Sequence, residues 1–195
     1  MTELLLLLAG LVGGALNTLA GGGSFIVFPA LLAVGVPPVL ANASNTYAAL
    51  PGYVSGAIGL WKDIVAYRDR LLVYGIVAAV FGYAGAELLL RVSDAQFSTV
   101  VPWLMLFAVV LFVFGGRING FVAARAGTSR RAKAAGAAVL LVILATISIY
   151  GGFFNAGLGV LLLAFLALAG IANIHAANGL KLFTSSVIAL VAVVR

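Results

Sequence analysis

The chain has 195 residues, of which 64% are hydrophobic and only 8% are charged, and its mean hydropathy is +1.23. So few charges cannot cover the surface of a water-soluble globular domain, and the composition excludes one. The net charge of +6 comes from basic residues in the gaps between apolar runs, which favours membrane orientation over nucleic-acid binding. The absence of cysteine excludes disulfides, thiolate metal sites and iron–sulfur clusters, and with a single histidine we expect no metal and no cofactor.

Six apolar runs predict an all-α, polytopic membrane protein. Each run approaches the length of about 20 residues that a bilayer span requires. The N-terminal run also resembles a cleavable signal peptide, but its only early charge is Glu3, where a signal peptide carries Lys or Arg. We therefore interpret it as a membrane segment. The six runs cover about 4–35, 38–60, 71–90, 98–116, 134–169 and 176–195.

Two of these runs are too long for one straight membrane helix. The first has roughly 32 residues and would measure about 48 Å, against a hydrocarbon core of about 30 Å. Gly21, Gly22 and Gly23 predict a break in it, with Ser24 as the N-cap of a second half-helix. The fifth run has the same design, with a glycine-rich stretch at 151–159. Each half of the chain is therefore expected to open with a broken helix.

The basic residues predict the sides of the loops. The segments 61–70 and 117–133 hold three and five Lys or Arg residues. Because an excess of Lys and Arg marks the cytoplasmic side, both loops are expected to be cytoplasmic. If every run crosses the membrane once, the N-terminus and Arg195 lie on that side and Arg91 lies outside. A re-entrant hairpin at either broken helix would instead move the N-terminus across.

The two halves of the chain align with each other. We therefore expect two tandem repeats, at 1–126 with four helices and at 134–195 with the first two helices only, as in a truncated or short variant. Four spans per copy would give both copies the same orientation in the membrane. Duplicated halves with matching interruptions indicate a secondary transporter. The aligned pairs are Gly21 with Gly157, Gly23 with Gly159, Asn42 with Asn178, Asn45 with Lys181 and, after a two-residue gap, Asn17 with Asn155.

Two stretches of the sequence resemble the paired signatures of the TauE/SafE sulfite exporter family: LNTLAGGGSFIVFPALLAVGVPPVLANASNTYAALPG and YGGFFNAGLGVLLLAFLALAGIANIHAANGLKLF. Both contain a glycine-rich break, an apolar half-helix and an Ala-Asn pair before a polar turn, and the resemblance covers essentially the whole chain. It implies a bacterial-type inner-membrane permease, nominally of eight helices, that exports sulfite or small organosulfur and related organic anions.

The two breaks, and the polar helix faces that follow them, supply the candidate substrate site. Helix N-termini favour anions, and amides in hydrocarbon must find partners, so we expect these groups to enclose one anion cavity. The alternatives are glycines that only permit close packing and amides that only join helices. The predicted substrate-binding residues are Asn17, Gly21, Gly22, Gly23, Ser24, Asn42, Ser44, Asn45, Thr46, Asn155, Gly157, Gly159, Asn178 and Lys181.

Lys181 is the residue on which this site depends most. A lysine inside the membrane costs about 3 kcal/mol on insertion scales unless it is solvated or paired. Glu87 is the only membrane-proximal acid that could pair with it. We expect Lys181 to face the anion, and the alternative is that it snorkels to the membrane surface. His175 is a candidate for proton coupling, with an interfacial position as the alternative.

The sequence thus predicts a secondary transporter, not an enzyme, that lies in the lipid bilayer and moves a small anion by alternating access. No nucleic-acid partner is expected, and a homodimer is left open. One alternative is a membrane structural or assembly subunit. Another is an intramembrane hydrolase with Ser24 and His175 as a dyad, although the glycine that follows the serine of rhomboid-type proteases is missing here.

Overall fold

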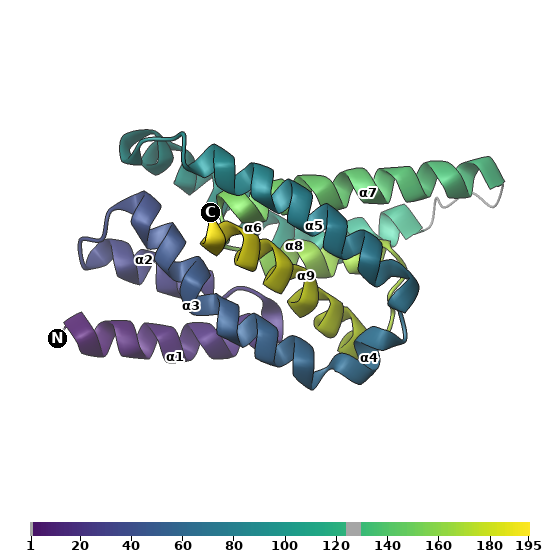
Figure 1. Ribbon diagram of the computed structural model, residues 1–195, viewed down its shortest axis with the longest axis horizontal. Helices are drawn as coiled ribbons and strands as arrows, with labels where there is room; N and C mark the ends of the chain where they lie inside the picture. Colours follow the sequence, from purple (N-terminus) through teal and green to yellow (C-terminus); the bar gives the residue numbers. More distant parts are fainter. Residues whose placement is uncertain (1, 124–129) are drawn as a thin grey trace.

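The computed structural model describes residues 2–123 and 130–195, and the described part is helical with no strand (Figure 1). The fold is therefore all-α, as predicted. Four of the described helices are long and apolar enough to span a membrane: α1, α5, α7 and α9. The helices are α1 (Thr2–Ala20), α2 (Ser24–Ala33), α3 (Pro38–Gly59), α4 (Trp61–Val65), α5 (Arg68–Leu89), α6 (Asp94–Ala123), α7 (Arg130–Phe153), α8 (Leu158–Leu168) and α9 (Ile174–Val194).

The first apolar run breaks at Gly21–Gly23, as predicted, and α2 then folds back along α1. The backbones of Gly13 and Gly23 touch, and a Cβ added at Gly13 would lie 2.5 Å from Cγ2 of Val27. These contacts pair later residues of α2 with earlier residues of α1, which makes the two helices antiparallel. The first run is therefore a hairpin, the alternative to a run that crosses the membrane once.

The fifth run forms a second hairpin, α7–α8, which enters from the opposite end of the helix bundle (Figure 1). After α8 the chain returns to the start of α5, where Arg70 Nη1 donates to the carbonyl oxygen of Ala169 at 2.8 Å. The two hairpins meet at their tips, because a Cβ added at Gly21 would lie 2.5 Å from the Cα of Gly159. The broken segments are thus inverted relative to each other, which contradicts copies that lie the same way up. The repeat boundaries themselves remain a prediction.

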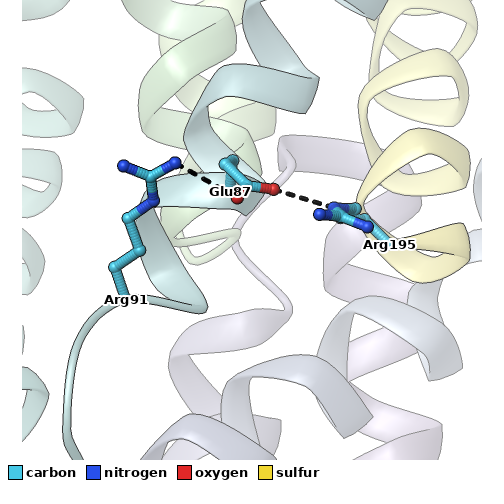
Figure 2. A network of polar contacts seen from close by, with 3 residues as sticks. All are labelled: Glu87, Arg91 and Arg195. Atoms are coloured by element: carbon cyan, nitrogen blue, oxygen red, sulfur yellow. Dashed lines mark hydrogen bonds and ion pairs between the residues drawn. The ribbon is translucent and has the colours of Figure 1, made fainter.

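A cluster of charges marks the end of the bundle from which the first hairpin enters. Glu87 binds Arg91 at 3.4 Å and Arg195 at 2.8 Å (Figure 2). The hydrogen bond that Arg195 donates to the Glu87 carboxylate raises the pKa of Arg195, so this residue stays charged. Arg195 therefore lies at the same end as Arg91, and its predicted place beside the basic loops is wrong. The hairpin geometry also moves the N-terminus to this end, away from the segment 61–70.

The two predicted cytoplasmic loops are shorter than expected. Helix α4 occupies half of the segment 61–70. In the segment 117–133, α6 continues to Ala123 and α7 begins at Arg130. Residues 124–129 lie outside the described residues. The end of α6, the start of α7 and α4 still lie at one end of the bundle, opposite the end of α5 (Figure 1).

Small residues and aromatic rings pack the helices together. Where α5 and α7 cross, a Cβ added at Gly85 would clash with the carbonyl oxygen of Ile149. A Cβ added at Gly152 would clash with the carbonyl oxygen of Gly82. Such close backbone approach is typical of membrane helices, because lipid is as apolar as a hydrophobic core and gives little drive for burial. On α2, Phe28 is fully buried and packs edge-on against Phe154, with ring centroids 5.5 Å apart. This contact ties the half-helix of one hairpin to the break of the other.

Candidate functional site

The tips of the two hairpins bring the N-termini of α2 and α8 together inside the bundle. Gly21 and Gly157 adopt the left-handed backbone conformation, with φ of 78° and 81°, which glycine reaches without strain. A Cβ added at Gly157 would lie 3.0 Å from Cζ of Phe25, in the first turn of α2. The N-terminus of a helix carries partial positive charge, although the N–H groups of Phe25 and Leu158 already donate to the carbonyl oxygens of Gly22 and Asn155. The junction therefore has the polarity that favours an anion.

Ser24 is not the N-cap that the sequence suggested. The N-cap of α2 is Gly23, whose φ of −58° and ψ of −32° are already helical, so Ser24 is the first residue of the helix proper. Its hydroxyl oxygen accepts a hydrogen bond of 2.9 Å from Asn45 Nδ2, and both side chains are buried. Ser24 and Asn45 thus join the first hairpin to α3.

The side chain of Asn42 forms hydrogen bonds with the backbone on both sides of the second break. Its Nδ2 donates to the carbonyl oxygen of Phe153 at 3.0 Å, and its Oδ1 accepts from the backbone N–H of Asn155 at 3.4 Å. The Asn155 Oδ1 accepts from the Tyr53 hydroxyl at 3.4 Å, while its Nδ2 is buried and has no partner among the described residues. The second break therefore presents an unused hydrogen-bond donor.

Lys181 is fully buried and does not snorkel. Its Nζ donates to the carbonyl oxygens of Asn17 at 3.3 Å and Thr18 at 3.1 Å, in the last turn of α1. Carbonyls at a helix C-terminus carry partial negative charge, so they stabilise an ammonium group. Glu87, the acid suggested as its partner, binds Arg91 and Arg195 instead.

Each half of the chain therefore caps the broken helix of the other half. Asn42 from α3 binds the end of α7, and Lys181 from α9 binds the end of α1. Helix ends buried in a membrane need such partners, because no water is present to hydrate them. These caps join the first hairpin to α9, which follows the second break, and the second hairpin to α3, which follows the first break.

The other predicted residues lie at varying distances from the tips. Gly22 is half-buried at the first break, whereas Gly23 and Gly159 are buried beside Gly13 and Gly21. Thr46 donates to the Asn42 carbonyl oxygen at 2.9 Å and stays on α3. Asn178 has a buried Oδ1 without a partner in the described part of the chain. His175 is exposed at the start of α9.

Two cavities divide the polar residues between them, so they do not line one shared cavity. A cavity of about 120 Å³ lies between α1, α2 and α3, and its polar lining is Asn17, Ser24 and Asn45. A larger one of about 390 Å³ lies between α3, α5 and α9 and is lined by Ser44, Thr46 and Arg195, with Asn42 at its wall. Lys181 lines neither of these two. Hydrogen bonds from Asn42, Asn45 and Lys181 instead join the hairpins to α3 and α9.

Two tyrosines at the second break were missed as site residues. Tyr53 binds Asn155, and Tyr150 donates to the carbonyl oxygen of Ala156 at 2.7 Å. The position of Tyr150 next to the glycine-rich stretch was a signal of this role in the sequence. Tyr53 lies two turns after the polar residues of α3, and only its burial reveals it.

The geometry gives no support to the Ser–His dyad. The described structure shows the Ser24 hydroxyl bonded to Asn45, with no bond to His175, which is exposed. A nucleophilic serine must be within hydrogen-bond reach of its base. The described residues also contain no group of three His, Asp or Glu side chains that could hold a metal ion.

Sequence comparisons relate the chain to known membrane proteins. The family model described as "Sulfite exporter TauE/SafE" matches residues 6–195. A probable membrane transporter protein of Haemophilus influenzae is 31% identical over 80% of the chain and 58% of its own length. The probable membrane transporter proteins ORF9 of Sinorhizobium sp and YfcA of Escherichia coli K12 are each 26% identical, over 85% and 82% of the chain and 61% and 57% of their own lengths. The chain thus spans about three fifths of these curated relatives, and no solved structure matches it.

Proposed function

Because the chain belongs to the TauE/SafE sulfite exporter family and has the apolar helices of a membrane transporter, we propose that it exports sulfite or a small organosulfur anion by alternating access. The observation that carries this proposal is the meeting of Gly21 and Gly159 at the tips of two hairpins that enter from opposite ends. In secondary transporters, broken helices that meet inside the membrane form the substrate site.

The donors at the tips suit an oxyanion. The N–H groups of Ser24 and Gly159, which have no hydrogen-bond partner in the described part of the chain, would bind its oxygens together with the unpaired Asn155 Nδ2. Ser24 and Asn45, which line the smaller cavity, would orient it. The ammonium of Lys181 would offset its negative charge from the end of α1. An ion leaves water only where hydrogen bonds and opposite charge replace its hydration.

Alternating access would follow from the inverted arrangement of the hairpins. The first hairpin opens toward the end that holds Glu87, and the second opens toward α4 (Figure 1). Rocking of one hairpin against its neighbours would expose the tips to one side of the membrane at a time. The caps provided by Asn42 and Lys181 would have to rearrange during this motion, because each joins a hairpin to a helix of the other half.

The test is anion flux in proteoliposomes, with sulfite, thiosulfate, an alkanesulfonate and a carboxylate as substrates. Lys181→Ala should lower sulfite flux at subsaturating concentration by roughly 10- to 100-fold, the effect expected for the loss of a charged hydrogen-bonding partner. Lys62→Ala removes an exposed charge far from the tips and should transport like the wild type.

Flux in Lys181→Ala equal to that of the wild type would reject the assigned role of Lys181. A chain that inserts and folds but moves none of these anions would instead favour a structural or assembly subunit. The relatives are longer than this chain, so the assay also tests whether these 195 residues transport by themselves.

A further inference from the structure

Two backbone carbonyl oxygens bind Lys181 at the end of α1. The carbonyl oxygens of Asn17 and Thr18 accept its hydrogen bonds at 3.3 and 3.1 Å. Three further buried side-chain oxygens have no partner in the described part of the chain: Asn17 Oδ1, Asn178 Oδ1 and Ser185 Oγ. Asn178 precedes Lys181 by three positions and Ser185 follows it by four. Asn178, Lys181 and Ser185 therefore lie on one face of α9.

In the described part of the chain, neutral carbonyl oxygens accept the hydrogen bonds of this ammonium group, and no acid binds it. The described ion pairs place Glu87 at the end of α5, with Arg91 and Arg195. Carbonyl, amide and hydroxyl oxygens at the C-terminal end of a broken helix are the ligands with which transporters bind Na⁺. They are also the ligand type that hard cations prefer. The surroundings of Lys181 are thus those of a cation site.

We propose that the end of α1 is a monovalent-cation site whose built-in occupant is the ammonium of Lys181. The carbonyl oxygens of Asn17 and Thr18 are its ligands on α1, and the side chains of Asn178 and Ser185 supply further oxygens from α9. A tethered ammonium joins the first hairpin to α9 without a free ion. Removal of the ammonium would leave a site of the Na⁺ class. This inference depends only on these contacts and not on the identity of a transported anion.

The experiment measures the Tm of the purified chain in detergent at constant ionic strength. In N-methylglucamine chloride, whose cation is too large for the site, Lys181→Ala should melt about 5 °C or more below the wild type, because charged hydrogen bonds are lost. Addition of about 100 mM Na⁺ or propylammonium, which carries the atoms missing from alanine, should restore at least half of this loss through binding to the folded state. The wild type should not respond to either cation.

Matched controls separate the cation site from general salt effects. Lys62→Ala should behave like the wild type, because this residue is exposed. Neutral 1-propanol should not replace propylammonium, since it fills the space of the side chain without its charge. Asn178→Ala combined with Lys181→Ala should weaken the response to Na⁺. A response of the wild type or of Lys62→Ala as large as that of Lys181→Ala would overturn the proposal, as would failure of both cations.

A second readout covers the case in which Lys181→Ala does not survive purification. Membranes that contain the variant are then solubilised in each salt, and the yield of monodisperse protein is compared. A higher yield in Na⁺ or propylammonium than in N-methylglucamine supports the cation site, and equal yields refute it. Neither readout includes anion flux, so the failure of the cation site and the failure of the transport proposal are distinguishable.

Discussion

At the scale of single residues, substitutions at two glycines can distinguish the free-energy cost of backbone strain from the cost of a close contact. Gly21 and Gly35 both have left-handed backbones, with φ of 78° and 85°. A Cβ at Gly21 would meet Gly159, whereas a Cβ at Gly35 would meet nothing within 4 Å. We expect Gly35→Ala to cost about 1–2 kcal/mol from strain alone. Gly21→Ala should cost about 2–5 kcal/mol, because overpacking at the hairpin tips adds to the strain.

Thermal unfolding of both variants in the same detergent checks this difference. Equal melting temperatures would mean that the tips do not touch, and the basis of the proposed substrate site would be lost. The Gly35→Ala variant should retain anion flux, since the linker between α2 and α3 lies away from the tips.

Single residues were predictable where a polar type interrupts an apolar run. Lys181, Asn42 and Asn45 stand out for this reason, and all three are buried in the structure. Their partners were not predictable, because Lys181 binds the carbonyl oxygen of Asn17 across 164 positions of the chain. The carbonyl of any residue can accept such a bond, so its identity leaves no trace in the sequence.

At the scale of helices, the sequence located both breaks but not the direction of the chain after them. Glycine signals an interruption, whereas a fold-back depends on contacts such as that between Gly13 and Gly23. The short linkers that end both hairpins carry no charge, so the distribution of Lys and Arg could not assign them to a side. The error about Arg195 followed directly from this missing information.

Cysteine pairs can test the first hairpin, because the chain has no cysteine of its own. Gly13→Cys with Val27→Cys should form a disulfide on mild oxidation and lose reactivity with a polymer-linked maleimide, since an added Cβ at Gly13 lies 2.5 Å from Val27 Cγ2. Gly14→Cys with Val27→Cys is the matched control, because a Cβ at Gly14 meets nothing within 4 Å. One continuous helix would separate the first pair by about 21 Å, and both pairs would then stay reactive.

At the scale of the whole molecule, the hairpins reverse the predicted side of the N-terminus. The start of α1 lies at the end of the bundle where the Val39 N–H donates to Asp94 Oδ1, and α4 lies at the other end (Figure 1). Eight of the eleven basic residues belong to the segments 61–70 and 117–133. Because an excess of Lys and Arg marks the cytoplasmic side, we predict that the end with α4 faces the cytoplasm and that the N-terminus lies outside.

Single cysteines at exposed positions test this orientation in spheroplasts with a membrane-impermeant maleimide. Thr2→Cys and Ser93→Cys should both react in intact cells, because both positions lie at the outer end. Lys62→Cys should react only after permeabilisation. Labelling of Thr2→Cys together with Lys62→Cys would favour a first run that crosses the membrane once. The hairpin tips could not then meet inside the bilayer, and the paired breaks would no longer explain how one anion site reaches both sides.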